Sequence, residues 1–426
     1  MKEIIVTFLL TAFGAFHLVC GEDSKLVNEK EFNQMCEILR LAEGEPEKIM
    51  EEPANLTSII DRLQMFVKAT YVKDSLYKEA MERRKGTVNN SGAAKMSMHR
   101  ANDIIRWRVT HEKLIKLAEK ATILVSGIRE ERRLANVSRK FALERMAQVV
   151  YGANAGRLME KEEFEKFAVH TGDTLIGNSA EETCGAGYHP STEDAMAGRS
   201  LVGDFFCLCV GEENNETVCH KSIKGPGRKK LWKNVSYDGS DVAFGPGWFK
   251  IKDEACPKNE NLKLITPEKI QDAVREFNKL LGRQRENIIM NMKESEGFRT
   301  YVFGRAKKIH TGVFDRSENI CTGKNDQMCV NYAYRLLTQK GIEWQLRLLD
   351  AEKYLVEMER HNKEAKVLLG RLWKLAENMK SAAAKINLNL EHLMMESEVN
   401  EVEEDGAGFS ISLTVLAMMA LTAFVA

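Results

Sequence analysis

The feature that most constrains this fold is a long helical pattern between Tyr334 and Leu393. Small and apolar residues recur there at alternating steps of three and four, and no proline interrupts the pattern. Such steps keep one stripe on one face of a helix, and a stripe of this length has to pack against partner helices. The stripe consists of Leu348, Ala351, Leu355, Met358, Ala365, Leu369, Leu372, Ala376, Met379, Ala383, Ile386, Leu390 and Leu393, and it extends back through Trp344 and Leu337.

A single helix of about fifty residues is a rod of roughly 80 Å, since each residue adds 1.5 Å. An ordinary core helix is the alternative, but helices in globular domains average about twelve residues. We therefore predict a mainly α protein, an elongated antiparallel coiled coil or helical bundle. Asn362 is a polar position in the stripe, and an Asn there often fixes register and oligomer number. We predict that role for Asn362.

Three further helical patterns occupy residues 22–170, which we expect to form the N-terminal helices of the bundle. The polar break at 86–94 is expected to be the tip of a helical hairpin. The predicted helices run from Glu29 to Leu41, from a cap at Thr57 or Ser58 through Ile60, Leu63, Val67 and Leu76, and from Met96 to Val150.

Helical periodicity is lost after Thr171, where glycines, prolines and cysteines become frequent. Residues 171–333 are therefore expected to form a loop-rich, disulfide-bonded distal lobe, with a short strand at 201–210 and a helix at 267–292. The long C-terminal bundle helix is assigned to residues 334–400. This order places the lobe at one end of the bundle.

The cysteines point to disulfides. Eight remain once the first 21 residues are set aside, and an even number in a secreted chain indicates pairing, although eight cysteines permit 105 pairings. Cys36 stands alone in its region and is expected to tie the first helix to the lobe. A zinc site at Cys207, Cys209, Cys219 and His220 is the alternative, but an oxidising compartment favours disulfides. The eight are Cys36, Cys184, Cys207, Cys209, Cys219, Cys256, Cys321 and Cys329.

The N-terminus has the pattern of a secretory signal peptide at residues 1–21. Lys2 precedes an apolar run from Ile4 to Val19, and small residues precede an expected cut after Gly21. A lipoprotein signal at Cys20 is the alternative, but Val19 stands where a small residue is required. We expect the mature chain to be exported.

The C-terminus has the pattern of a glycosylphosphatidylinositol (GPI) signal at residues 401–426. Acidic and small residues precede an apolar tail that ends without Lys or Arg, and such a tail is removed when the lipid is attached. Asp405 or Gly406 is the expected attachment residue. A transmembrane helix is the alternative. The predicted location is the extracellular face of the plasma membrane.

Composition argues against nucleic-acid binding and motifs argue against catalysis. Lys plus Arg equals Asp plus Glu at 62 each, so no bulk charge favours nucleic acid. Neither a Gly-x-Ser-x-Gly elbow nor an HExxH zinc motif occurs. We expect no enzyme activity, no metal and no cofactor.

Five N-glycosylation sequons begin at Asn55, Asn89, Asn136, Asn215 and Asn234.

Four segments resemble the variant surface glycoproteins of African trypanosomes, and in particular their B-type N-terminal domain. They are FNQMC ending at Cys36, FFCLCVGEENNETVC at 205–219, Gly-Trp-Phe at 247–249 before Cys256, and CVNYAYRLLTQKGIEWQLRLLDAEKYL at 329–355. Many members carry a cysteine-rich C-terminal domain, whereas no cysteine follows Cys329 here. The chain therefore resembles a type without that domain, or a related receptor.

The resemblance implies a GPI-anchored homodimer or other small homo-oligomer in a dense surface coat. Such a coat shields the parasite membrane from host antibodies, and variation of its members gives antigenic variation and immune evasion. The alternative that we carry forward is a GPI-anchored receptor on the same scaffold that takes up a host macromolecule. Both functions are non-catalytic.

Overall fold

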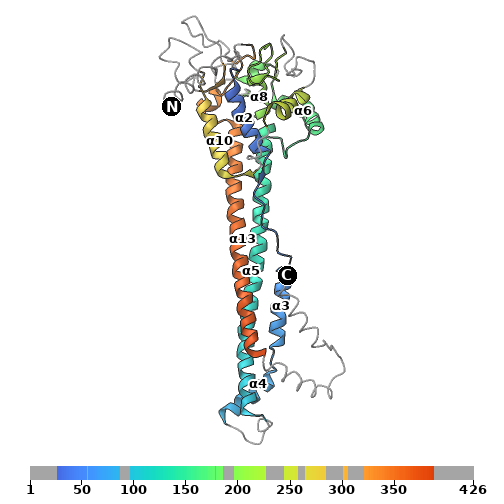
Figure 1. Ribbon diagram of the computed structural model, residues 1–426, viewed down its shortest axis with the longest axis vertical. Helices are drawn as coiled ribbons and strands as arrows, with labels where there is room; N and C mark the ends of the chain where they lie inside the picture. The colour runs from blue at the N-terminus through green and yellow to red at the C-terminus, as the bar shows by residue number, and fades with distance from the viewer. Residues whose placement is uncertain are drawn as a thin grey trace, which may run out of the picture. The chain divides into compact units, whose positions relative to one another are not determined.

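The computed structural model describes residues 26–54, 56–86, 96–177, 179–185, 196–226, 244–257, 264–284, 301–305, 321–325 and 327–387. These parts of the chain are mainly helical (Figure 1). They fall into two compact units, which are described separately. Unit 1 comprises Met1–Met50 and Glu131–Lys363, and unit 2 comprises Glu51–Glu130 and Glu364–Ala426.

Several predictions made from the sequence lie outside the described residues. They are the signal peptide at 1–21, the GPI region at 401–426, the hairpin tip beyond Gly86, and the sequons at Asn55, Asn89 and Asn234.

Two long helices run through the protein. Helix α5 spans Met98–Tyr151 with 54 residues, and helix α13 spans Glu343–Asn387 with 45 residues. Each contributes residues to both units. The predicted long helices are therefore present, and neither contains a proline.

In unit 1 the two long helices pack side by side in opposite directions. The rings of Phe141 and Tyr354 are 5.3 Å apart, and Glu131 Oε2 lies 2.6 Å from His361 Nδ1. Residue numbers therefore fall along α5 as they rise along α13. These contacts confirm the predicted antiparallel helical packing. The packing is favourable because it buries the apolar stripes that neither helix can bury alone.

Unit 2 adds two shorter helices, α3 (Leu56–Ala69) and α4 (Asp74–Lys85), to the long pair. The prediction of one helix reaching Leu76 was wrong, because the chain leaves the helix at Thr70. The Thr70 hydroxyl donates to the carbonyls of Phe66 and Val67 in the last turn of that helix. The core beside α4 is formed by Val72, Ala80, Met96, Ala101, Ile104, Ile105, Trp107 and Ile386.

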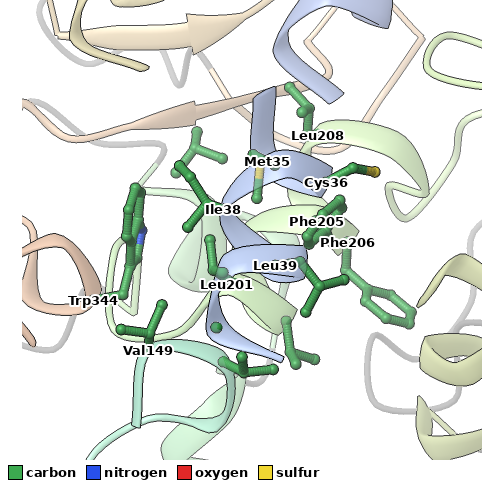
Figure 2. Close-up of a cluster of buried hydrophobic side chains, with 14 of the residues drawn as sticks. Met35, Cys36, Ile38, Leu39, Val149, Leu201, Phe205, Phe206, Leu208 and Trp344 are labelled. Atoms are coloured by element: carbon green, nitrogen blue, oxygen red, sulfur yellow. The ribbon is translucent and has the colours of Figure 1, made fainter. Parts of the chain in front are cut away.

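The remaining elements belong to unit 1. Helix α2 (Glu29–Ala42) packs against α8 and α10 (Figures 1 and 2). The other helices are α6 (Lys161–Leu175), α7 (Ala180–Cys184), α8 (Leu201–Cys209), α9 (Phe244–Lys250), the π-helix η3 (Ile251–Ala255), α10 (Pro267–Leu280) and α12 (Ala333–Leu337).

Two small sheets connect these helices. Strand β1 (Glu45–Pro46) pairs in parallel with β2 (Leu264–Ile265), and β3 (Val302–Gly304) pairs antiparallel with β4 (Cys329–Asn331). In the second sheet Phe303 lies opposite Val330. Both sheets join segments that are far apart in the sequence.

The predicted strand at 201–210 is a helix. Helix α8 begins after Ser200, whose side chain accepts a hydrogen bond from Gly203 N, and every one of its residues is buried. A short apolar run that is buried on all sides has no amphipathic period, so periodicity cannot distinguish strand from helix. Figure 2 shows Phe205 and Phe206 of α8 on one side of α2, with Trp344 on the other.

Helical periodicity was expected to be lost after Thr171, but in the described residues between 171 and 262 the chain forms α7, α8, α9 and η3. The predicted helix at 267–292 ends early, because Leu281 is extended and Gly282 has a left-handed φ of 68°. Gly282 N then donates to Val302 O at 2.8 Å and turns the chain toward β3. Residues 285–292 lie outside the described part.

The predicted helix at 334–400 is interrupted near its start. Helix α12 ends at Leu337, and the exposed Gln339 and the half-buried Gly341 adopt left-handed φ angles of 59° and 71° before α13 begins. A left-handed residue cannot continue a right-handed helix. Residues 388–400 of the predicted helix lie outside the described residues.

Asn362 makes contacts within its own chain. Its Oδ1 accepts from Met50 N at 2.8 Å, and its Nδ2 donates to Lys48 O at 3.4 Å. The side chain is 2% exposed. The polar position in the stripe thus fixes the extended segment after β1 against α13, and its role in oligomer register stays a prediction.

We predict that Asn362→Leu increases the exchange rate of the Met50 amide hydrogen by about fivefold or more, because a hydrogen bond contributes roughly 1 kcal/mol. Hydrogen exchange followed by mass spectrometry measures this change. Asn378→Leu, at an exposed position of α13, is the matched control. Unchanged Met50 exchange would remove the anchoring role, and light scattering on the same samples tests oligomer number.

Candidate functional site

The candidate site is the cysteine-bonded lobe of unit 1, which we define as α2 together with the described residues between 175 and 337. All eight cysteines of the predicted set are paired there. The four disulfides are Cys36–Cys256, Cys184–Cys207, Cys209–Cys219 and Cys321–Cys329. The sulfurs considered for zinc are therefore bonded to other sulfurs.

The first disulfide ties α2 to the end of η3, as expected for Cys36. Arg40, one turn further along α2, reinforces this link because its guanidinium donates to the carbonyls of Lys252 and Cys256 at 2.5 and 2.8 Å. The same guanidinium pairs with Glu43 at 2.5 Å. Covalent and polar contacts therefore hold α2 and η3 together at one place.

Asn28, at the start of α2, joins that helix to α8 and to the residues next to β3 and β4. Its Nδ2 donates to Leu208 O at 2.9 Å and to Met328 O at 2.8 Å, while its Oδ1 accepts from Arg305 N at 2.9 Å. The side chain is fully buried. Gln284 Nε2 also donates to Oδ1, at 3.2 Å, so both donors and both lone pairs of the amide are used.

An ion pair between the buried Glu31 and the exposed Arg283 lies one turn away. Glu31 is fully buried, and Arg283 donates to its two carboxylate oxygens at 2.9 and 2.8 Å. This bidentate geometry satisfies both oxygens, which is what a buried carboxylate requires. The pair fixes the turn after α10 against α2.

Asp204 connects α8 to the start of α13. Its Oδ2 accepts from Tyr332 Oη at 2.7 Å and from Trp344 Nε1 at 2.8 Å, and its Oδ1 accepts from Gly198 N at 2.9 Å. Gly198 has a left-handed φ of 79°, and an added Cβ would lie 3.0 Å from Ile342 Cγ2. Only glycine fits this position without strain.

The environment of Asp204 disfavours its charge. Burial raises the pKa of the Asp204 carboxyl from 3.8 to about 6, and the three donors and the nearby Arg335 only partly offset that effect. The pKa of the Tyr332 hydroxyl is also raised, first by burial and then by the Asp204 carboxylate. The lobe therefore contains a carboxyl group that titrates near pH 6.

Two of the predicted sequons are described. Asn215 is exposed outside any helix or strand, where its Oδ1 accepts from Asn325 Nδ2 at 2.5 Å and its own Nδ2 is left for a glycan. Asn136 lies inside α5 and donates to Arg132 O at 3.1 Å. Asn215 therefore has the more suitable backbone for glycosylation, while occupancy at either site stays a prediction.

The described surface offers open hollows. One of about 490 Å³ lies on α10 and α13, and another of about 300 Å³ lies between α3 and α5 in unit 2. Among the described residues, His, Cys, Asp and Glu nowhere gather in threes able to hold a metal. No helix in the same ranges combines the length and apolar character that crossing a bilayer requires.

The sequence reasoning missed Asn28, Glu31 and Asp204, the three polar residues that organise the lobe. Asp204 had a signal, because a single acid inside the apolar run 201–210 needs buried partners. Asn28 and Glu31 had none, since their partners come from distant parts of the chain.

With this geometry in view, comparison with known proteins is decisive. The model of the trypanosomal VSG domain family matches residues 67–374, which is more than half of the chain. The chain belongs to this family. The abbreviation stands for variant surface glycoprotein, and VSG members are surface coat proteins.

A variant surface glycoprotein of Trypanosoma congolense, YnAT 1.3, is 33% identical to the chain over 103 residues. That similarity covers 24% of this chain and 23% of the relative, so the chain matches about a quarter of that protein's length. The resemblance inferred from the sequence motifs is therefore confirmed at the level of the VSG family.

We predict that stability falls as pH rises through the titration of Asp204. Its folded-state pKa is raised, so the carboxyl favours folding most below pH 4, and up to about 3 kcal/mol is lost by pH 7. Asp204→Asn, which has no charge, removes this part of the pH dependence. Urea unfolding of both proteins from pH 4 to 7.5 measures it, and identical slopes would contradict the assignment.

We predict unequal costs for removing two of the disulfides. Cys36 and Cys256 are 220 residues apart, whereas Cys321 and Cys329 are 8 apart. From loop-closure entropy, removing the disulfide is expected to lower the free energy of unfolding by about 5 kcal/mol for the longer loop and by about 2.5 kcal/mol for the shorter one. Paired alanine substitutions, compared by urea unfolding, test the order. Equal losses of unfolding free energy would show that chain entropy does not set the order of the two costs.

Proposed function

We propose that this VSG-family protein is a GPI-anchored coat glycoprotein of the plasma membrane, exported through the secretory pathway. In this role it shields other surface molecules from host antibodies and takes part in antigenic variation. The observation that carries the proposal is the family match over residues 67–374. The function needs no catalysis and no cofactor.

The construction of unit 1 supports this proposal. The lobe is fixed by four disulfides and by buried polar contacts at Asn28, Glu31 and Asp204. Exposed turns between these points carry little of the folding free energy, so their sequences can change without loss of the fold. A surface of this kind suits a protein whose exposed face varies under antibody pressure.

Self-association belongs to the same proposal. Several large apolar side chains of the long helices are exposed in the single chain, among them Ile123 at 70% and Trp373 at 42%. Apolar side chains on long helices favour association with further helices. We therefore propose a homodimer or other small homo-oligomer, and a glycan at Asn215 on its surface.

We predict that a phosphatidylinositol-specific phospholipase releases this protein from intact, surface-biotinylated cells as a major labelled species. A coat has to be abundant to cover the membrane, and a GPI lipid is the bond that the enzyme cuts. Quantitative mass spectrometry of the released fraction gives the copy number. A known GPI-anchored protein on the same cells is the control.

Two outcomes would contradict the proposal in different ways. Retention on the cell while the control is released would indicate a transmembrane tail. Release as a minor species that captures one host serum protein with nanomolar affinity would indicate a receptor on the same scaffold.

A further inference from the structure

One end of unit 2 has an excess of positive charge. Helix α4 ends there in three consecutive basic residues, and exposed Lys and Arg of α5 and α13 lie on the neighbouring elements. We call this surface the basic end. Its members are Arg83, Arg84, Lys85, Arg106, Lys380 and Lys385.

The three helices meet at this end through one apolar cluster. Ala80 of α4, Ile105 of α5 and Ile386 of α13 are buried together. Arg83 follows Ala80 by one turn, Arg106 follows Ile105, and Lys385 precedes Ile386. The basic residues therefore lie around the rim of a common core, and their charges act on the same region of solvent.

Acidic residues in the described helical segments at this end do not balance this charge. Segments 76–86, 96–107 and 377–387 contain eight Lys and Arg but only four Asp and Glu. Arg84, Lys85 and Lys385 make no ion pair with the part of the chain that the structure describes. Arg83 Nε is buried, and within that same part it has no hydrogen-bond acceptor.

The chain that follows α13 has the opposite charge. Residues 388–405 contain seven Asp and Glu and neither Lys nor Arg. The acids are Glu391, Glu396, Glu398, Glu401, Glu403, Glu404 and Asp405. An extended chain spans at most about 3.6 Å per residue, so the four-residue link from Asn387 at the end of α13 to Glu391 reaches at most about 14 Å.

We propose that the acidic segment 391–405 of this chain docks on the basic end of unit 2. Single exposed ion pairs are weak and are screened beyond about 8 Å at physiological salt. Here, however, several pairs form at once, and the covalent link to α13 gives the segment a high effective concentration at the surface. Charge complementarity and chain length together select this occupant.

Docking has a consequence for the anchor, and this step rests on the proposed function. Asp405 stands 18 residues after Asn387, so an extended tether allows about 60 Å between them. A docked segment brings Asp405 or Gly406, the expected attachment residues, close to the end of α13. It also covers glutamates that a protease would otherwise reach.

The test uses the purified full-length protein and a glutamate-specific protease. Cleavage after the glutamates of 391–404 is followed by mass spectrometry. Arg84→Glu with Lys85→Glu is expected to speed this cleavage about threefold or more, because the docked state is lost. Lys113→Glu with Lys120→Glu, which makes the same change of charge at exposed positions of α5, should leave the rate unchanged.

A charge swap distinguishes docking from damage to α4. Adding Glu401→Lys and Glu403→Lys to the Arg84→Glu, Lys85→Glu protein should restore protection of the remaining glutamates. Lys385→Glu, on α13, should by itself speed cleavage and so repeat the effect without touching α4. Failure of both the swap and the α13 variant would overturn the proposal.

Carbodiimide cross-linking of the unmodified protein gives an independent readout. Cross-links from Glu396, Glu398 or Glu401 to Lys85, Lys380 or Lys385 are expected, and 0.5 M salt should remove most of them. Flotation with phosphatidylserine vesicles tests the competing partner. If the variant with Arg84→Glu and Lys85→Glu loses vesicle binding while its cleavage rate equals that of the unmodified protein, the basic end binds anionic lipid and the docking proposal is wrong.

Discussion

The structure depends on the antiparallel contact between α5 and α13. Neither helix can exist alone at this length in water, because each has an apolar stripe that requires a partner. Phe141 against Tyr354 and Glu131 against His361 set the direction of the contact within unit 1. The lobe is built on the same pair, since Asp204 holds the start of α13 through Trp344. Packing, direction and the position of the lobe therefore follow from one seam.

The two long helices could be predicted from the sequence because they depend on local periodicity, and the stripe from Trp344 to Ile386 is regular. Local patterns failed where tertiary contacts decide. Helix α8 is buried on all sides and shows no amphipathic period, while α10 ends at Leu280 because Gly282 pairs with Val302. The cysteines predicted disulfides in the lobe, but their pairing depends on which segments meet in space.

The polar residues of the lobe explain how a fold can be specific while much of its surface is free to differ. Asn28 uses every donor and acceptor of its amide, and Glu31 has both oxygens bound by Arg283. Losing one partner of such a buried group costs more than losing an exposed contact. We infer that mutations are tolerated on the exposed turns and not at these positions, which is the division of tolerance that the proposed coat function requires.

The disulfides also decide what proteolysis can separate. Cys36–Cys256 closes a covalent ring that contains all of α5, so a single cut inside that ring opens it without releasing a fragment. Helix α13 lies beyond Cys329 and outside every ring. Gln339 and Lys340 are exposed between α12 and α13, so one cut there divides the protein into two covalently separate pieces, with α13 and everything that follows it in one of them.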